Sequence, residues 1–274
     1  MDYSRKNIRS FLYYCFPKAI YKHPSAVLDY KYFLINKILY AFLFVPLFLS
    51  APKIAAWTAE TFGLTVNTTN TASVSVVVSY TICALLAFDF SMFFSHFLQH
   101  KVPFLWQFHK VHHSAQVLTP ITVYRMHPMD DLLTGIVVTV ALGITGGAYM
   151  IVTESIVTPI QIFQVNGLLF IYYLAGYNLR HTHIWLNYPR WMLNFLISPA
   201  QHQIHHSNAP AHFDKNFGFI FSVWDRFFYT IYIPTNRENL KFGLSEVENK
   251  EFGSIFSLYF LPFKKAAALL RSKR

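Results

Sequence analysis

Histidine is the residue type whose number and spacing point most directly to chemistry in this sequence. The chain has 13 histidines among 274 residues, and most of them fall within residues 96–113 and 181–206. Imidazole is a ligand that suits Zn, Cu, Fe and Ni. The two windows therefore predict a metal site, although the ligand type alone does not choose the metal. The histidines in the windows are His96, His100, His109, His112, His113, His181, His183, His202, His205 and His206.

The spacing within the windows predicts two metal ions rather than one. His96 and His100 are four positions apart, so on a helix they share one face, one turn apart. Residues 109–113 and residues 202–206 both carry the motif His-x-x-His-His. The two adjacent histidines of such a motif diverge by about 100° around a helix. One of them can therefore face one metal ion while its neighbour faces a second.

The remaining histidines, His23, His127 and His212, stand apart from these motifs. A single histidine at a membrane border is more often a hydrogen-bonding residue than a metal ligand, and we interpret His23 in this way. Two interpretations stay open for His127 and His212: they support the metal ligands, or they only solvate their loops.

The composition predicts an integral membrane protein. Apolar residues make up 54% of the chain and charged residues only 13%, which is about half the usual charged share of a soluble domain. The formal net charge of +10 would suit nucleic acid. However, 22 of the 23 Lys and Arg lie within residues 1–37, 101–125 and 180–274. Membrane proteins keep such residues in their cytoplasmic segments, so the charge indicates topology and anionic lipid headgroups rather than nucleic acid.

Four stretches have the length and composition of membrane spans, for which about 20 mostly apolar residues are needed. They are residues 38–58, 73–95, 132–152 and 156–177. The first is interrupted by Lys53, so two interpretations stay open: it spans the bilayer or it lies in the interface. The last two are separated by three residues, which predicts a tight helical hairpin.

These spans place the chain in the all-α class, as an integral membrane helical protein with about four transmembrane helices. The N-terminus, residues 96–131 and everything after residue 178 would then lie on the cytosolic side, where they form a His-rich helical cap. The apolar pieces 184–200, 217–234 and 252–263 are too broken to cross and suit helices lying at the headgroup level. We expect residues 1–274 to form one membrane-embedded domain.

The histidine motifs resemble those of a known family. His96-x3-His100, His109-x2-His112-His113 and His202-x2-His205-His206, in this order around a helical hairpin, look like the fatty acid hydroxylase/sterol desaturase superfamily of integral membrane di-iron enzymes. The resemblance covers roughly residues 75–232. Within the superfamily, the single His181 after the last span looks most like the alkylglycerol monooxygenase and bacterial sterol desaturase-like branch.

The resemblance implies a set of iron ligands. Some relatives have an additional histidine four residues before His181, where this chain has Tyr177, so that either Tyr177, His183 or water would complete the metal shell. On a helix His183 would point away from His181. The implied ligands are His96, His100, His109, His112, His113, His181, His202, His205 and His206.

Three acidic residues are expected to support the ligands. Asp89 lies two turns before His96 on the same helical face, where a carboxylate could accept a hydrogen bond from an imidazole and fix its tautomer. An acid within an apolar span is costly, so a functional role for Asp89 comes first. Asp214 and Asp225 could serve the second window in the same way. For Asp225, pairing with Arg226 or Arg190 on the surface is an equal alternative.

The resemblance implies an O2-dependent di-iron hydroxylase, a monooxygenase that attacks a C–H bond of a membrane lipid: a fatty acyl group, a sterol or an ether lipid. A desaturase with the same di-iron site is the nearest alternative. A non-catalytic or metal-transport membrane protein is the next, although a transporter would place its ligands along a path inside the spans.

Electrons would come from an external donor. The chain has two cysteines and no recognisable haem or flavin signature, so an electron carrier such as a cytochrome b5 or a ferredoxin is expected to dock on the basic surface. The expected location is a bacterial inner membrane or the endoplasmic reticulum, with the metal site on the cytosolic side. The sequence leaves the lipid, the position of attack and the oligomeric state open.

Overall fold

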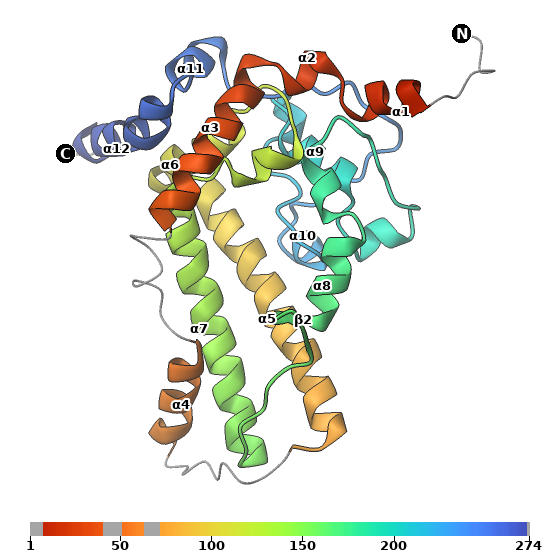
Figure 1. Cartoon of the computed structure of the whole chain (residues 1–274). Helices are drawn as coiled ribbons and strands as arrows, with labels where there is room; N and C mark the ends of the chain where they lie inside the picture. Colours follow the sequence, from red (N-terminus) through yellow and green to blue (C-terminus); the bar gives the residue numbers. More distant parts are fainter. Residues whose placement is uncertain (1–7, 41–50, 63–71, 273–274) are drawn as a thin grey trace.

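The computed structural model describes residues 8–40, 51–62 and 72–272. These residues are mostly helical, as the sequence predicts, and their strands, β1 (Gln161–Ile162) and β2 (Val165–Asn166), form one short antiparallel hairpin. Two long helices, α5 (Val74–Lys101) and α7 (Pro128–Thr153), run side by side away from a cap of shorter helices (Figure 1). The termini of the two long helices that meet the cap are the C-terminus of α5 and the N-terminus of α7.

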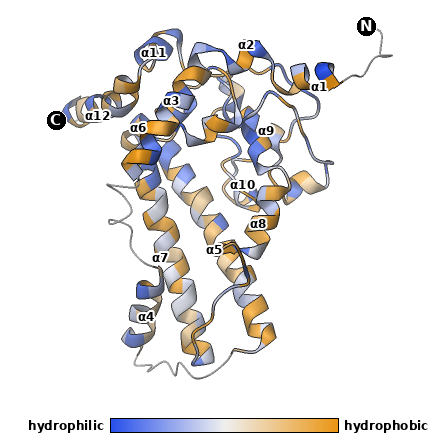
Figure 2. Cartoon of the chain, in the orientation of Figure 1, coloured by the Kyte–Doolittle hydropathy of each residue, from blue (hydrophilic) through white to orange (hydrophobic). Residues whose placement is uncertain are grey.

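Helices α5 and α7 are the two candidate membrane spans of the described residues. They contain 28 and 26 residues, and their most apolar windows have mean hydropathies of 1.9 and 2.0. Only 39% of the α5 window and 22% of the α7 window is buried inside the fold. The remaining residues of both windows are at least partly exposed, as expected of helices that contact lipid. Figure 2 shows the apolar residues along both helices. The predicted spans 73–95 and 132–152 coincide with these helices.

Small residues of α7 allow α4 (Ala51–Thr61) to pack closely against it. A Cβ atom built at Gly143 would lie 2.5 Å from the Cβ of Ile54, and one at Gly147 would lie 2.5 Å from the Cβ of Thr58. The two glycines are four residues apart and share one helical face. Small residues with this spacing are common where membrane helices meet, because they let the backbones approach.

The structure corrects the predicted span 156–177 and its helical hairpin. Helix α7 ends at Thr153, and the next residue, Glu154, has a left-handed φ of 51°, but no long helix follows within residues 156–177. The chain instead returns through an irregular segment, the β1–β2 hairpin and the short helix α8 (Gly167–Leu174). Pro159 has no backbone N–H to continue a helix, and the side chain of Asn166 accepts hydrogen bonds from Leu168 and Leu169, which starts α8 anew.

The predicted span 38–58 is described only at its two ends. Helix α3 (Pro24–Leu39) precedes it, and α4 begins at Ala51. Residues 41–50, including Pro46, lie outside the described residues.

The cap contains the remaining short helices. Of the three apolar pieces expected to form interfacial helices, only residues 252–263 belong to a long one, α12. Residues 184–200 and 217–234 instead form turns, short helices and extended segments. Backbone groups of the second stretch bond to buried side chains of other elements, while Trp191, Phe195, Phe227 and Tyr229 stay exposed. The cap elements are α1 (Ile8–Cys15), α2 (Lys18–Tyr21), α3, α6 (Pro103–His113), η3 (Pro120–Tyr124), η4 (Tyr177–His181), η5 (Met192–Asn194), α9 (Pro199–His205), η6 (Pro210–His212), α10 (Val223–Phe227), α11 (Glu246–Glu251) and α12 (Ile255–Ser272).

Candidate metal centre

Four elements bring the predicted histidine ligands together where α5 meets the cap. Val102 is extended and Pro103 occupies the first turn of α6, so the chain turns sharply between α5 and α6. Helix α9 begins with a capping box, in which Ser198 and Gln201 satisfy each other's backbone N–H groups. The histidines come from α5 (His96, His100), α6 (His109, His112, His113), η4 (His181) and α9 with its C-cap (His202, His205, His206).

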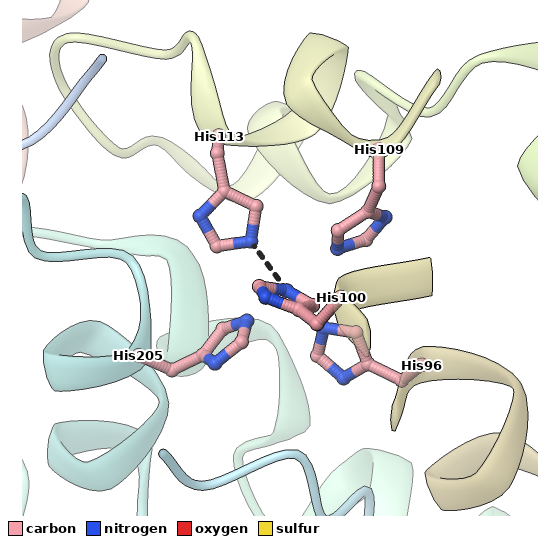
Figure 3. A group of neighbouring side chains, drawn as sticks. All are labelled: His96, His100, His109, His113 and His205. Carbon is pink, nitrogen blue, oxygen red and sulfur yellow. Dashed lines mark hydrogen bonds between the residues drawn. The ribbon is translucent and has the colours of Figure 1, made fainter. Parts of the chain in front are cut away.

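The nine histidines form two groups, within each of which the candidate ligand atoms lie within 4.8 Å of one another. We call them group A (His96, His100, His109, His113 and His205; Figure 3) and group B (His112, His181, His202 and His206). The adjacent pair His112–His113 is divided between the groups, and so is His205–His206. This division is the arrangement that the two His-x-x-His-His motifs predict.

The spacing of the imidazole nitrogens fits metal ions. In group B, Nε2 of His181 lies 3.0 Å from Nε2 of His202 and of His206, and 3.3 Å from Nε2 of His112. In group A, Nε2 of His100 lies 3.1 Å from Nε2 of His113. Imidazole nitrogens about 2.0–2.1 Å from one ion, in tetrahedral or octahedral geometry, would lie about 2.9–3.4 Å apart.

Several Nε2 atoms of group A have no other role in the fold. Those of His96, His109 and His205 are buried and have no hydrogen-bond partner, a condition that costs about 1–3 kcal/mol per polar group. The opposite nitrogens of His96 and His205 are occupied: Nδ1 of His96 lies 3.0 Å from the carbonyl of Phe217, and Nδ1 of His205 lies 2.7 Å from the carbonyl of Lys215. A carbonyl only accepts, so Nδ1 carries the proton and the Nε2 lone pair faces the group.

Burial keeps these imidazoles neutral. Desolvation, reinforced by the neighbouring imidazoles, holds the pKa values of His109, His113 and His206 well below 6.5 and lowers the pKa of His205 to about 3. Neutral imidazole is the form that binds metal. The donor set, its spacing and the neutral charge of its imidazoles therefore suit two metal ions.

The first of the three predicted supporting acids, Asp89, has a different role from the one expected. Asp89 accepts hydrogen bonds from the backbone N–H of Ile220 (2.6 Å), that of Phe221 (3.3 Å) and the indole of Trp224 (2.7 Å), not from an imidazole. The stretch 217–226 packs against α5, and its N–H groups occupy the carboxylate, so no histidine bonds to it. Asp89 therefore fixes this stretch to α5.

Asp225 also binds backbone rather than a histidine. Its carboxylate accepts from the N–H groups of Phe217 and Gly218, each at 2.8 Å, and from the hydroxyl of Thr230. It is fully buried, so the alternative of a surface pair with Arg226 or Arg190 is also wrong. Because the carbonyl of Phe217 holds His96, Asp225 acts on group A through the backbone.

Asp214 lies beside a grouped histidine, but this histidine is His100 of the first window and not one of the second window, where the sequence predicts its role. Its Oδ1 is 3.6 Å from Nδ1 of His100, and its Oδ2 is 2.6 Å from Nζ of Lys101. The first distance is too long for a hydrogen bond, and the carboxylate pairs with Lys101 instead.

Sequence reasoning missed two side chains at the centre. Oδ2 of Asp130 lies 3.5 Å from Nδ1 of His109, and neither atom has another partner. Nη2 of Arg180 lies 2.9 Å from Nδ1 of His202 and orients that ring. Asp130 lies in the first turn of the helix that begins at Pro128, and this position could have marked it as a candidate partner of a histidine. Nothing in the sequence distinguishes Arg180 from the other basic residues.

The other histidines lie outside the two groups. Nε2 of His183 contacts the carbonyl of Tyr14 at 2.7 Å, so His183 anchors the N-terminal region. His23 and His127 accept N–H groups at the starts of α3 and α7, and His212 pairs with Glu238 at 2.9 Å. Tyr177 is not in either group; it packs against Phe219 and lines a cavity beside the centre.

Two cavities reach the centre from different directions. The helix-side cavity, about 260 Å³, is lined by α5, the start of α7 and η4, and it touches His96 and His109 of group A and His112, His181 and His202 of group B. The cap-side cavity, about 580 Å³, touches His100, His113, His205 and His206. Met92, Tyr177 and Phe219 make the helix-side cavity largely apolar, whereas Lys110, Asp214 and Glu248 line the cap-side cavity.

Comparison with known proteins identifies the family. The family description "Fatty acid hydroxylase" matches residues 81–230, more than half of the chain, and the chain belongs to this family. The match confirms the resemblance expected over residues 75–232. No solved structure matches the chain.

The relatives carry the names of lipid hydroxylases. The chain is 26% identical over 162 residues to the alkylglycerol monooxygenase of Caenorhabditis elegans, covering 59% of this chain and 28% of that protein. It is 26% identical over 172 residues to the ornithine lipid hydroxylase OlsE of Rhizobium tropici, covering 62% and 47%. It is 26% identical over 157 residues to human cholesterol 25-hydroxylase, covering 57% and 52%. The chain thus spans about half or less of the length of these relatives.

Proposed function

We propose that this protein is an O2-dependent di-iron hydroxylase that acts on a C–H bond of a membrane lipid. The observation that carries the proposal is the sorting of nine neutral histidines, seven of them buried and two half-buried, into two groups of metal-ligand spacing. Family membership supports hydroxylation, and the names of the relatives support a lipid substrate. Bound iron would supply the activation of O2 and the oxidation of the C–H bond.

The protein's own contribution is to position the substrate. We propose that the lipid chain enters the helix-side cavity, because its apolar lining includes Met92 of α5 and Phe219 and because both histidine groups border it. A cavity of about 260 Å³ has room for a segment of one acyl chain. Holding one C–H bond at a fixed distance from both groups gives the regiochemical control that orientation provides.

We propose that the electrons come from an external carrier of the cytochrome b5 or ferredoxin class. One atom of O2 enters the C–H bond and the other leaves as water, which needs two electrons and two protons per turnover. The cap-side cavity touches histidines of both groups, so a carrier docked there would be near the centre. Lys101 and Lys110 lie at this cavity in ion pairs with Asp214 and Glu248, and an acidic carrier would compete with these carboxylates for the two lysines. Neutralising Lys101 and Lys110 should slow turnover without changing metal content; unchanged turnover would contradict this docking site.

We also propose that the centre faces the cytosol, from a bacterial inner membrane or the endoplasmic reticulum. The basic cap on the histidine side of α5 and α7 supports this orientation, because cytoplasmic segments retain Lys and Arg.

Metal analysis combined with lipid profiling tests the proposal. Purified wild-type protein should hold two iron ions, one for each histidine group. Cells expressing it should contain a hydroxylated lipid that is lost in His109→Ala, whereas His183→Ala, outside both groups, should keep the product. An unsaturated product would identify a desaturase instead. Stoichiometric zinc, with no lipid change under aerobic, reducing conditions, would refute the proposal.

A further inference from the structure

A buried ion pair lies in the cap behind the histidine-bearing end of α6. Nη1 of Arg125 lies 2.7 Å from Oδ1 of Asp29, and the two residues are 2% and 1% exposed. Burying two charges costs desolvation that their attraction does not reliably offset. The pair is therefore poorly explained as a source of stability alone, and its other contacts indicate what it holds.

Arg125 brackets the two adjacent histidines of α6. Its Nε donates to the carbonyl of Val111 at 3.0 Å, and its Nη2 donates to the hydroxyl of Ser114 at 2.8 Å. Val111 directly precedes His112 of group B, and Ser114 directly follows His113 of group A. One rigid, planar guanidinium thus fixes both ends of the turn from which the two groups take a ligand each.

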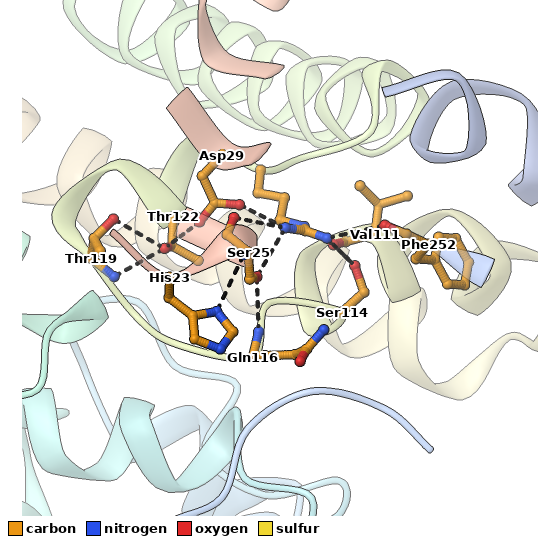
Figure 4. A network of polar contacts seen from close by, with 10 residues as sticks. His23, Ser25, Asp29, Val111, Ser114, Gln116, Thr119, Thr122 and Phe252 are labelled. Atoms are coloured by element: carbon orange, nitrogen blue, oxygen red, sulfur yellow. Dashed lines mark hydrogen bonds and ion pairs between the residues drawn. The ribbon is translucent and has the colours of Figure 1, made fainter. Parts of the chain in front are cut away.

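Helix α3 fixes this guanidinium in turn. Besides Arg125, Asp29 accepts the hydroxyl of Thr122 through Oδ2 at 2.7 Å. The hydroxyl of Ser25, one turn earlier in α3, lies 3.3 Å from Nη1 of Arg125 and accepts the N–H of Gln116 at 3.1 Å. Figure 4 shows the network converging from α3, the end of α6 and the segment that contains η3.

We propose that Asp29 and Arg125 form a clamp that sets the position of His112 in group B and of His113 in group A. Both are positioning residues, since neither touches a candidate ligand atom. The inference rests on the proposed metal centre for its functional meaning. Through Asp29, helix α3 helps to position the ligands, although α3 precedes the family-matched residues 81–230.

Four variants test the clamp in the full-length protein in lipid nanodiscs. Asp29→Asn keeps the shape and removes one charge, and Arg125→Met removes the bonds to Val111 and Ser114. The double variant Asp29→Leu/Arg125→Met removes both buried charges together. The control is Asn36→Leu, because Asn36 is buried on the same helix and bonds to Met126 and Tyr259 rather than to α6.

Two readouts separate positioning from general stability: iron retention against a chelator and amide hydrogen exchange at residues 111–114. We expect Arg125→Met to lose iron about 10–100-fold faster, the usual effect of removing a group that orients a ligand, and to exchange faster at these amides. The double variant should regain thermal stability without regaining iron retention. Asn36→Leu should lose stability and keep its iron.

Iron retention that follows thermal stability across all four variants would overturn the clamp. A wild-type chain that binds no metal would refute the metal centre instead. In that case the exchange measurement still decides, because unchanged exchange at residues 111–114 in Arg125→Met would overturn the clamp on its own.

Discussion

The contact between Asp130 and His109 gives the centre a carboxylate that lies outside the histidine motifs. Their facing atoms, 3.5 Å apart, have no other partners, so a small approach on metal binding would complete a carboxylate–histidine–metal unit. A carboxylate in this position raises the basicity of the ligand and fixes its tautomer.

Replacing Asp130 with Asn tests this role. We expect Asp130→Asn to lower metal affinity about 10–100-fold while the protein stays folded, because an amide orients the ring but does not raise its basicity. Chelator competition measures the effect. Asp131→Asn is the matched control, since Asp131 bonds to Tyr40 rather than to a histidine. Equal affinity losses in the two variants would contradict the role.

The neutral histidines also make a prediction about pH. Desolvation lowers the pKa of His205 to about 3, below its ordinary value of 6.5. Below pH 6.5 the unfolded chain therefore binds more protons than the folded chain. The stability that His205 contributes is complete above pH 6.5 and is lost progressively as the pH falls towards 3.

Thermal unfolding of metal-stripped protein between pH 8 and pH 5 checks this dependence. The melting temperature should fall on acidification, and His205→Gln should flatten the fall. A melting temperature that stays constant over this range, or an equal slope in the variant, would show that the imidazoles are not held neutral by burial.

The residues that sequence could predict are those whose relationship is local. His-x-x-His-His puts its members on definite faces of one helix, so the division of His112 and His113 follows from helical geometry alone. Asp130 and Arg180 reach their histidines across 21 and 22 residues of chain, through turns that no local pattern specifies. Asp89 was singled out correctly as a buried acid but was assigned the wrong partner for the same reason.

At the scale of elements, α4 packs closely on α7 because Gly143 and Gly147 have no side chains that would collide with α4. Gly143→Leu and Gly147→Leu should each destabilise the protein, because overpacking of this kind costs about 1–3 kcal/mol and the built Cβ positions already lie 2.5 Å from α4. The measurement is the melting temperature in nanodiscs. Ala148→Leu, at an exposed position of the same helix, is the control, and a loss of the same size there would argue against the contact.

The prediction of a span at residues 156–177 was wrong because hydropathy counts apolar side chains and ignores the hydrogen bonds of the backbone. The segment is apolar enough, but Pro159 and the capping Asn166 divide it. Thr81 of α5 accepts the N–H of Ile160, and its carbonyl accepts the side-chain amide of Asn166. Polar groups of α5 thus replace the bonds that a continuous helix would have made. Such compensation comes from the tertiary fold, which a window of sequence does not contain.

Across the whole molecule, the cap presents an apolar face beside the two long helices. Phe256, Phe260, Phe263 and Leu270 are exposed along one side of α12, with a fully apolar cavity of about 610 Å³ between α12, α3 and the start of α7. We expect this side of α12 to rest in the bilayer interface, as sequence predicts for residues 252–263.

Fluorescent labels at single cysteines measure this placement. In a chain with Cys15 and Cys83 replaced by Ser, a label at Phe260→Cys should be quenched by a lipid-attached quencher, whereas one at Glu246→Cys in α11 should be quenched by a soluble one. Equal access of the soluble quencher to both labels would place α12 in water.

Groups A and B are also coupled mechanically, because two pairs of adjacent histidines, His112–His113 and His205–His206, are divided between them. Each pair shares one peptide bond, so ordering one member restricts the backbone of the other. The first ion bound should therefore lower the entropy cost of binding the second. Loading should be cooperative, with chains holding a single ion rare at half saturation, and native mass spectrometry during iron titration would count them directly.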